Sequence, residues 1–144
     1  MGMQSHVGTD WPKVDDYETA LKKFLEKVDV HVSELDFSAT SQEKAAKSYS
    51  EYFKMFQKYG NKSSSQNKIE NITIWGINNE NSWINPSGGK KTYPLLFNIV
   101  DNVKTSTKEV TYDTGKETLP LYDEGDSYSA NESFWAVINA CKTN

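Results

Sequence analysis

The sequence has little of several residue types that mark particular classes of protein. It contains a single cysteine, Cys141, among 144 residues, which excludes an internal disulfide and a cysteine-rich metal site. No apolar run approaches the roughly 20 residues that a membrane-spanning helix needs. Positive charge is not in excess: the formal net charge is −4, so electrostatics gives no reason to expect binding to nucleic acid or to an anionic membrane.

A signal peptide is also missing from the first residues, which carry neither a basic segment nor an apolar one. What is present is the composition of a globular domain, with 36% hydrophobic and 25% charged residues. Aromatic residues make up 12% of the chain, a proportion that suits a packed core and a sugar-stacking surface equally well. Cys141 falls on the apolar face of a helical pattern, and we expect it to be a small core residue.

Strand and helix patterns alternate along the chain. The predicted elements are the end of a strand at residues 1–6, a helix opened by a capping box at Asp15 and Glu18, a strand over 30–37, a helix with a capping box at Thr40 and Glu43 and a stop at Gly60, a strand over 69–75, a long loop over 78–91, and a last helix capped by Asn131. This alternation is typical of parallel α/β packing. Residues 98–131 are polar with β-prone pieces, and we expect an irregular excursion or a small hairpin there.

The strand predicted over residues 30–37 ends on a carboxylate. Val28, Val30 and Val32 alternate as they would in a strand. Glu34 lies where this strand runs out, and Asp36 follows two residues later. In (β/α)8 barrels the catalytic groups stand at the C-terminal ends of parallel strands. A solvated strand end has the same signature, so this segment alone leaves both interpretations open.

Several short segments occur in a recognisable order. They are Gly2-Met3-Gln4-Ser5-His6, Ser33-Glu34-Leu35-Asp36, Ile74-Trp75-Gly76-Ile77-Asn78-Asn79-Glu80-Asn81-Ser82-Trp83, Tyr93-Pro94-Leu95-Leu96-Phe97 and Ser133-Phe134-Trp135-Ala136-Val137-Ile138. With one helix between each of the first three, they resemble the last three βα units of glycoside hydrolase family 10, the endo-β-1,4-xylanases. The resemblance implies a partial (β/α)8 TIM barrel, strands 6 to 8, in which residues 1–144 form the C-terminal part of a single catalytic domain and residues 98–131 are an insertion.

The resemblance also implies a retaining mechanism. One carboxylate attacks the anomeric carbon, and a second carboxylic acid, about 5–5.5 Å away, donates a proton. Glu34 would be the nucleophile. His6 would hydrogen-bond Glu34, and Asp36 would in turn hold His6, a chain that fixes the orientation and charge of the imidazole. Taken alone, His6 would be interpreted as a satisfied core histidine.

The residues expected to bind substrate follow from the same resemblance. Gln4 would point into the cleft, and Trp75 and Trp83 would wall the sugar in the −1 position, because a flat indole matches the C–H face of a pyranose. Asn79 stands where the family usually has an aspartate, which removes a charge but keeps an acceptor. The implied ligand is xylan or a xylo-oligosaccharide, with no cofactor and no metal. A plain strand-end role stays open for Gln4, and a core role for Trp75.

The family's proton donor, a glutamate that follows an asparagine on an earlier strand, has no counterpart in the sequence. Asn79-Glu80 lies on the wrong strand, and Asn131-Glu132 caps the last helix. We therefore expect a C-terminal fragment of a secreted enzyme that is inactive alone and self-associates through exposed strand edges.

Two interpretations of another kind stay open. One is a non-catalytic carbohydrate-binding domain that uses Trp75 and Trp83 as a stacking platform, although such domains are usually β-sandwiches. The other is an α/β domain completed by a partner chain. Within the enzymatic interpretation, cellulose or mixed glucan is the alternative substrate.

Overall fold

The computed structural model describes residues 1–60, 66–85, 91–100, 104–112, 115–122 and 127–142, with backbone alone over 104–112, over 115–122 and at 127. The elements are β1 (Gly2–Met3), β2 (His6–Gly8), α1 (Val14–Leu25), β3 (Val30–Ser38), α2 (Gln42–Gly60), β4 (Ile69–Ile74), β5 (Phe97–Val100), β6 (Lys104–Tyr112), β7 (Gly115–Tyr122), β8 (Ser127–Ala130) and α3 (Glu132–Lys142). The predicted alternation of strands and helices is confirmed, and the strands predicted over 30–37 and 69–75 end within one residue of β3 and β4.

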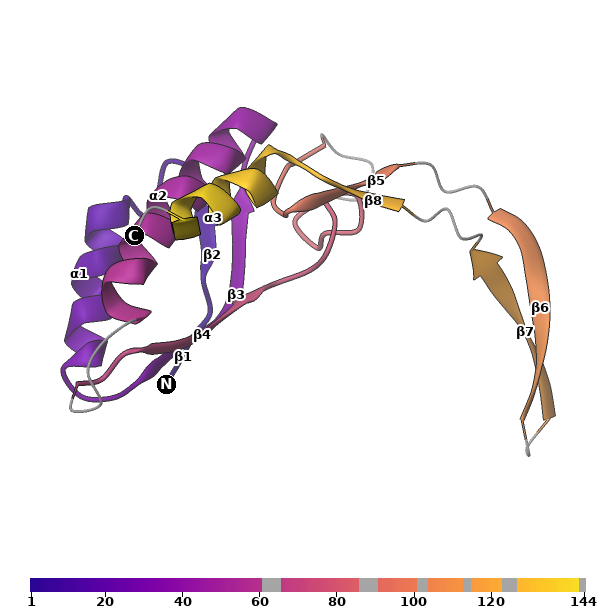
Figure 1. Cartoon of the computed structure of the whole chain (residues 1–144), viewed down its shortest axis with the longest axis horizontal. Coiled ribbons are helices and arrows are strands. Elements are labelled where there is room, and N and C mark those ends of the chain that lie inside the picture. Colours follow the sequence, from indigo (N-terminus) through magenta and orange to yellow (C-terminus); the bar gives the residue numbers. More distant parts are fainter. Residues whose placement is uncertain (61–65, 86–90, 101–103, 113–114, 123–126, 143–144) are drawn as a thin grey trace.

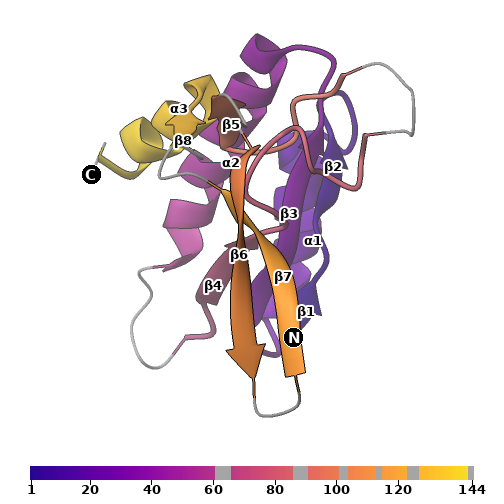
Figure 2. The same ribbon diagram turned by 90° about the vertical axis from the view of Figure 1, so that its right-hand side faces the viewer.

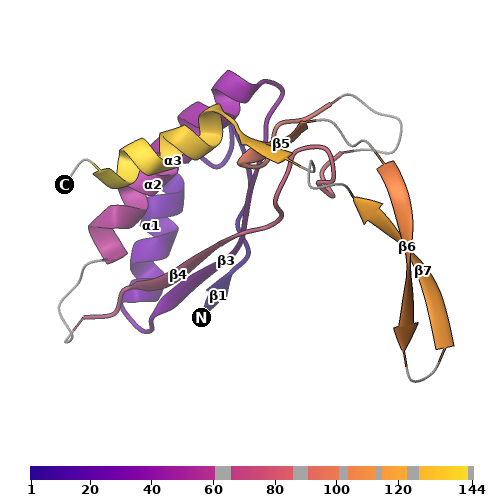
Figure 3. The ribbon, with the colours of Figure 1, turned by 45° about the vertical axis from the view of Figure 1, so that its right-hand side comes forward.

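A parallel sheet with β3 at its centre forms the body of the protein. β1 and β2 pair with one side of β3, and β4 pairs with the other. The three helices lie on one face of this sheet (Figures 1 and 3). We call the opposite face the open face. Among the described residues, no strand pairs with the outer edges of β1, β2 or β4, so this is a small open α/β unit and the described part contains no closed barrel.

The core lies between the sheet and the helices. β3 contributes Val30, Val32, Leu35 and Phe37, all fully buried. Phe37 meets two tyrosines of α2 edge to face, with ring centroids 4.6 Å from Tyr49 and 5.1 Å from Tyr52. Such contacts add to the stabilisation that burial of the rings provides. Much of the aromatic content is therefore used for packing.

The first predicted helix start is wrong in detail. α1 begins at Val14, and Lys13 occupies the N-cap position without a side-chain cap hydrogen bond. Asp15 and Glu18 therefore do not form the capping box that their spacing predicts. Glu18 instead accepts hydrogen bonds from Lys58 and Tyr59 of α2. Its spacing from Asp15 matched a capping box, but tertiary contacts determine its role.

The second helix start is shifted by one residue. The Ser41 hydroxyl, and not Thr40, accepts a hydrogen bond from the Lys44 backbone N–H at 3.3 Å, the geometry of an N-cap. At the other end, Gly60 is the last residue of α2, whereas the sequence predicted it beyond the helix end.

The last helix begins at the predicted residue but buries a different face from the one that the sequence predicted. Asn131 Oδ1 accepts hydrogen bonds from the backbone N–H groups of Ser133 and Phe134, at 2.9 and 3.3 Å, and so caps α3. Cys141, predicted to be a core residue, is exposed. The buried residues of α3 are Ser133 and Ala140, because these small side chains allow the helix to approach its neighbours closely. Among the described residues, no helix is both long and apolar enough to cross a membrane.

Residues 98–131 include the hairpin that the sequence suggested. β5 and β8 pair antiparallel, and β6 and β7 form a longer antiparallel hairpin. Figures 1 and 3 show the β6–β7 hairpin projecting away from the sheet and helices, and Figure 2 shows it in front of them, with its strands running vertically. The described residues of this excursion thus form antiparallel β structure, which lies between β4 and α3 in the chain.

Candidate active site

A register shift in β3 sets which side chains reach the open face. Val32 pairs with Met3, and Asp36 pairs with His6, so β3 uses one residue more than the neighbouring segment. A shift at the same place separates β3 from β4. Without it, the alternation from Val32 would direct Glu34 and Asp36 toward the helices. Because the bulge changes the phase, both carboxylates lie on the side of His6.

His6 lies between these two carboxylates. Its Nδ1 is 3.0 Å from Asp36 Oδ1, and its Nε2 is 3.1 Å from Glu34 Oε2. Both hydrogen bonds that the resemblance implies are therefore present. A positively charged imidazole donates from both nitrogens, which matches two carboxylate partners. The arrangement is a carboxylate–imidazole–carboxylate chain across two parallel strands, with His6 as the first residue of β2 and both carboxylates within β3. β3 continues to Ser38, so Glu34 does not stand at its end as the sequence predicted.

Trp83 joins this chain by a contact that the sequence did not predict. Its indole Nε1 donates to Asp36 Oδ2 at 2.7 Å. The Trp83 and His6 rings meet edge to face, with centroids 4.9 Å apart and planes at 73°. Residues 36 and 83 are distant in sequence, and no sequence signal identified this pair. Asp36 thus binds two side chains of the candidate site at once.

Gln4 and Trp75 are both exposed. Gln4 lies between β1 and β2, and the alternation of the strand places it on the same face as His6. Trp75 follows β4 directly, and its backbone N–H donates to the Leu35 carbonyl at 2.9 Å. The side chain of Trp75 is 46% exposed and that of Trp83 is 62% exposed. A core role for Trp75, which the sequence left open, is wrong.

Asn79 lies in the interior. It is fully buried, and its Oδ1 accepts a hydrogen bond from the Leu95 backbone N–H at 2.8 Å. Its Nδ2 donates to Gln42 Oε1 at 3.3 Å and to Asn98 Oδ1 at 2.7 Å. Because all of its polar atoms bond within the protein, this placement argues against the expected contact with substrate. Asn79 instead ties the loop after β4 to α2 and β5.

Glu80 is next to Asn79 but is not a free loop acid. Its carboxylate accepts hydrogen bonds from Lys91 Nζ at 3.2 Å and from the Ile99 backbone N–H at 3.0 Å. Burial by itself raises the pKa of Glu80, but these donors outweigh burial and hold the pKa below its usual value. A general acid needs a raised pKa, so Glu80 is poorly suited to donate a proton.

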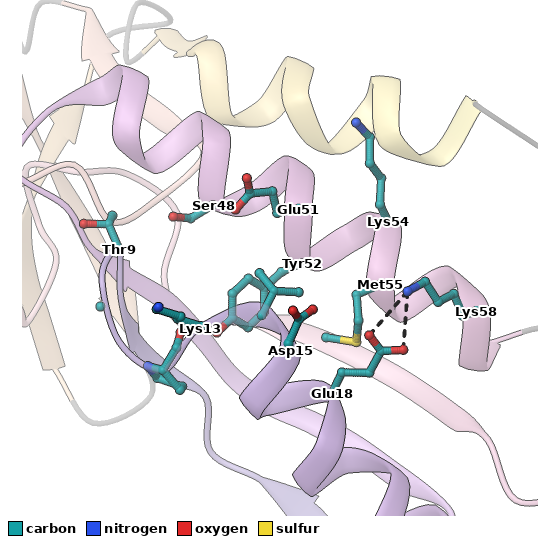
Figure 4. A pocket seen from close by; sticks show the side chains of 13 residues that line it. Thr9, Lys13, Asp15, Glu18, Ser48, Glu51, Tyr52, Lys54, Met55 and Lys58 are labelled. Carbon is teal, nitrogen blue, oxygen red and sulfur yellow. Dashed lines mark hydrogen bonds and ion pairs between the residues drawn. The ribbon is translucent and has the colours of Figure 1, made fainter.

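Two clefts lie near these elements. One of about 270 Å³ is lined by His6, Gly8, Asp36, Ser38, Trp83 and Ile84, among others, and so adjoins the carboxylate–imidazole chain. The other, of about 510 Å³, lies between α1 and α2. Figure 4 shows that charged side chains of both signs line it and that Glu18 pairs with Lys58 across it. In the part of the chain that the structure describes, no cluster of three or more ligating side chains fits a metal ion.

Comparison with known proteins identifies the family. The family model described as glycosyl hydrolase family 10 matches residues 1–112. This chain belongs to glycosyl hydrolase family 10. The endo-1,4-beta-xylanase B of Butyrivibrio fibrisolvens is 31% identical over 141 residues, which cover 88% of this family 10 chain and 21% of that protein. A bifunctional endo-1,4-beta-xylanase of Ruminococcus flavefaciens is 39% identical over 98 residues, covering 67% of this chain and 9% of that protein.

Solved family 10 structures share the fold. The Clostridium thermocellum endo-1,4-beta-D-xylanase 10B, solved in complex with xylohexaose, superimposes with a TM-score of 0.66 at 24% identity. The match covers 96% of this chain and 22% of that one. A family 10 endoxylanase from a sugarcane soil metagenome gives a TM-score of 0.64 at 24% identity, over 96% of this chain and 38% of that one. This family 10 chain therefore spans well under half of the proteins that it matches.

The titration of His6 can be predicted from its contacts. Partial burial by itself lowers the pKa of His6, but the hydrogen bonds and charges of Asp36 and Glu34 outweigh it, so the pKa lies above the ordinary value of 6.5. We expect an NMR titration of the imidazole to show this. Glu34→Gln, which removes one of the two charges, lowers the pKa. The only other histidine is His31, and a His31→Asn variant assigns the signals.

The raised pKa also sets a pH dependence of stability. Protonated His6 is favoured in the folded state, so its stabilising contribution is complete below pH 6.5 and is lost as the pH rises through the folded-state pKa. Denaturant unfolding should show this loss in the unchanged chain and a flatter profile in His6→Gln. A His6 pKa at or below 6.5 would contradict the proposed pairing.

Proposed function

We propose that this chain is the nucleophile-bearing part of a retaining endo-1,4-β-xylanase and corresponds to the last three βα units of its barrel. The observation that carries the proposal is the hydrogen-bonded chain of Glu34, His6 and Asp36 across two adjacent parallel strands. The family assignment and the xylanase names of its relatives support the substrate class. In this proposal, residues 1–144 belong to one catalytic domain and residues 98–131 are an insertion.

Glu34 has the chemistry of a nucleophile. Its side chain is 20% exposed, so one part of the carboxylate reaches solvent while Oε2 contacts His6. In the first step, a carboxylate oxygen of Glu34 bonds to the anomeric carbon and the glycosidic oxygen leaves with a proton from a second acid. In the second step, water attacks the anomeric carbon, its proton passes to the second acid, which is now a carboxylate, and the bond to Glu34 breaks. His6 orients Glu34, and Asp36 orients His6.

The exposed indoles supply the sugar contacts. Trp75, directly after β4, and Trp83, in the loop that follows, have large exposed surfaces, and indole surfaces stack on pyranose rings. Gln4, on the face of His6, offers an amide to sugar hydroxyl groups. The cleft of about 270 Å³ beside Trp83 provides space next to the reacting centre. The proposed ligand is xylan or a xylo-oligosaccharide.

The proton donor must come from outside the described residues. Asp36 is fully buried and already binds two donors, and Glu80 has a lowered pKa. We infer that the acid lies in the part of the family 10 domain that this chain does not match. That part would also cover the unpaired edges of β1, β2 and β4, through which the isolated chain self-associates. Because polymeric xylan does not enter cells, we infer a secreted enzyme.

A mechanism-based label tests the role of Glu34. A 2-deoxy-2-fluoro-β-xylobioside with a dinitrophenolate leaving group needs no acid catalyst, because this leaving group departs without a proton. We expect the unchanged chain to accumulate a covalent adduct at Glu34, since the fluorine slows the release of the sugar by water. Peptide mass spectrometry locates the adduct.

Two variants sharpen this experiment. Glu34→Gln keeps the shape of the side chain but removes the nucleophilic oxygen, so no adduct should form. Glu80→Gln alters a carboxylate outside the proposed chemistry and should leave labelling intact. An adduct at a residue other than Glu34, or none under conditions that label a longer family 10 relative, refutes the assignment of the nucleophile.

A further inference from the structure

Trp83 is exposed and yet is held in one orientation. With 62% of the residue exposed, packing covers too little of the indole to fix it. Its Nε1–H donates to Asp36 Oδ2 at 2.7 Å, and Asp36 is fully buried. Hydrogen bonds to ionised acceptors are shorter and stronger than those between neutral groups. This contact is therefore the one that anchors the ring.

Trp75 provides the comparison within the same chain. It follows β4 and is fixed by its backbone hydrogen bond to Leu35. Trp83 lies in the segment between β4 and β5, outside any helix or strand, so its backbone is not fixed by a sheet. Among the described residues, the indole nitrogen of Trp83 has a hydrogen-bond partner, and no such bond is found for Trp75. A side-chain hydrogen bond thus holds Trp83 in place, whereas Trp75 is held by its backbone next to β4.

The two oxygens of Asp36 serve different partners. Oδ1 is 3.0 Å from His6 Nδ1, and Oδ2 accepts from Trp83. The edge-to-face contact of the two rings, with centroids 4.9 Å apart, closes the triangle. One buried carboxylate therefore sets the spacing between the imidazole that contacts Glu34 and the indole next to it.

We propose that Asp36 is a positioning residue for Trp83 as well as for His6, so that one carboxylate aligns the sugar-stacking indole with the nucleophile. The description of Trp83 as a sugar-stacking wall rests on the proposed function, whereas its anchoring by Asp36 does not. An asparagine at position 36 has only one acceptor oxygen, so it cannot accept from both Trp83 and a protonated His6. A leucine there accepts from neither.

The indole N–H signals of the four tryptophans test the anchoring directly. In the unchanged chain labelled with ¹⁵N, we expect the Trp83 signal, assigned with Trp83→Phe, to lie downfield of the others. Its exchange with water should be slowed by about tenfold or more, as expected for a hydrogen bond to a charged group. This measurement needs no variant at position 36. Exchange of Trp83 as fast as that of the other three indoles overturns the proposal.

The variant Asp36→Leu, which leaves no acceptor oxygen at this position, tests the role of the carboxylate. We expect the Trp83 signal to lose its downfield shift and its slow exchange, while the signals of Trp11, Trp75 and Trp135 keep their positions and report an intact fold. The variant His6→Phe removes the other partner of Asp36 and should leave the Trp83 signal downfield. An unchanged Trp83 signal in Asp36→Leu would show that another contact anchors the ring.

Titration with xylohexaose separates this inference from the proposed function. If both hold, Asp36→Leu and Trp83→Ala each weaken the binding of xylohexaose, measured by isothermal calorimetry. If the indole signals behave as expected but Trp83→Ala binds xylohexaose as the unchanged chain does, the anchoring stands and the sugar-binding role of Trp83 fails.

Discussion

The 144-residue chain assayed by itself is expected to hydrolyse xylan about 10²- to 10⁴-fold more slowly than a longer family 10 relative, because a general acid contributes roughly that factor. Among the described residues, neither Asp36 nor Glu80 is able to supply the proton. Asp36 is buried beneath His6 and Trp83, and Glu80 is held ionised by Lys91 and the backbone of Ile99. Reducing-end release from xylan at equal molar concentrations measures the difference.

The outcome is informative in combination with the labelling of Glu34. A chain that forms the adduct with an activated xylobioside but leaves xylan intact has a nucleophile and lacks an acid. Turnover of xylan by the unchanged chain that Glu34→Gln abolishes would show instead that a proton donor is present. Turnover that Glu34→Gln leaves unchanged would point to a contaminating enzyme.

Replacement of Gly76 by alanine is expected to destabilise the chain by about 2–4 kcal/mol, a sum of backbone strain and overpacking. Gly76 follows Trp75 and has a φ of 133°, a conformation that residues with a Cβ rarely adopt. A Cβ at this position would lie 2.7 Å from Leu95 Cδ1. Leu95 is 1% exposed, so it has little room to move away. Denaturant unfolding of Gly76→Ala measures the loss.

Gly60 is the matched control. It ends α2, and a Cβ built on it meets no atom within 4 Å. Gly60→Ala should therefore be neutral or slightly stabilising, because alanine is the better helix former. Equal stabilities of the two variants would show that the conformation of Gly76 is not needed. If Gly76→Ala also weakens xylohexaose binding, the turn positions the indoles on either side of it.

The parts of the fold that the sequence predicted are those with strong local patterns. The apolar runs of β3 and β4 and the periodic face of α2 specify their elements without help from distant residues. Local patterns did not predict which residues of β3 beyond Val32 face the helices. The valines up to Val32 would place Glu34 inward, and only pairing with β1, β2 and β4 shifts the strand by one residue. The prediction that Cys141 is a core residue was wrong for a related reason, since α3 buries the small residues Ser133 and Ala140 instead.

In the candidate site, too, the residues with local sequence signals were predicted, and those positioned by distant contacts were not. Glu34, His6 and Asp36 were found through short motifs, because their chemistry requires particular side chains in order along the chain. Asn79 was assigned to substrate through the family resemblance, yet its partners Leu95, Gln42 and Asn98 come from three separate segments. The bond between Trp83 and Asp36 likewise joins residues far apart in sequence. Contacts of this kind depend on tertiary structure.

The bulge in β3 determines on which face of the sheet the Glu34 side chain lies. Three residues of β3, 33–35, stand opposite the two residues Gln4 and Ser5, while Met3 and His6 keep their partners Val32 and Asp36 on either side. Without this shift, the alternation from Val32 would turn Glu34 and Asp36 toward the helices and Leu35 toward the open face. One extra backbone residue at this point therefore decides whether the carboxylates of the site or the apolar side chains of β3 pack against the helices.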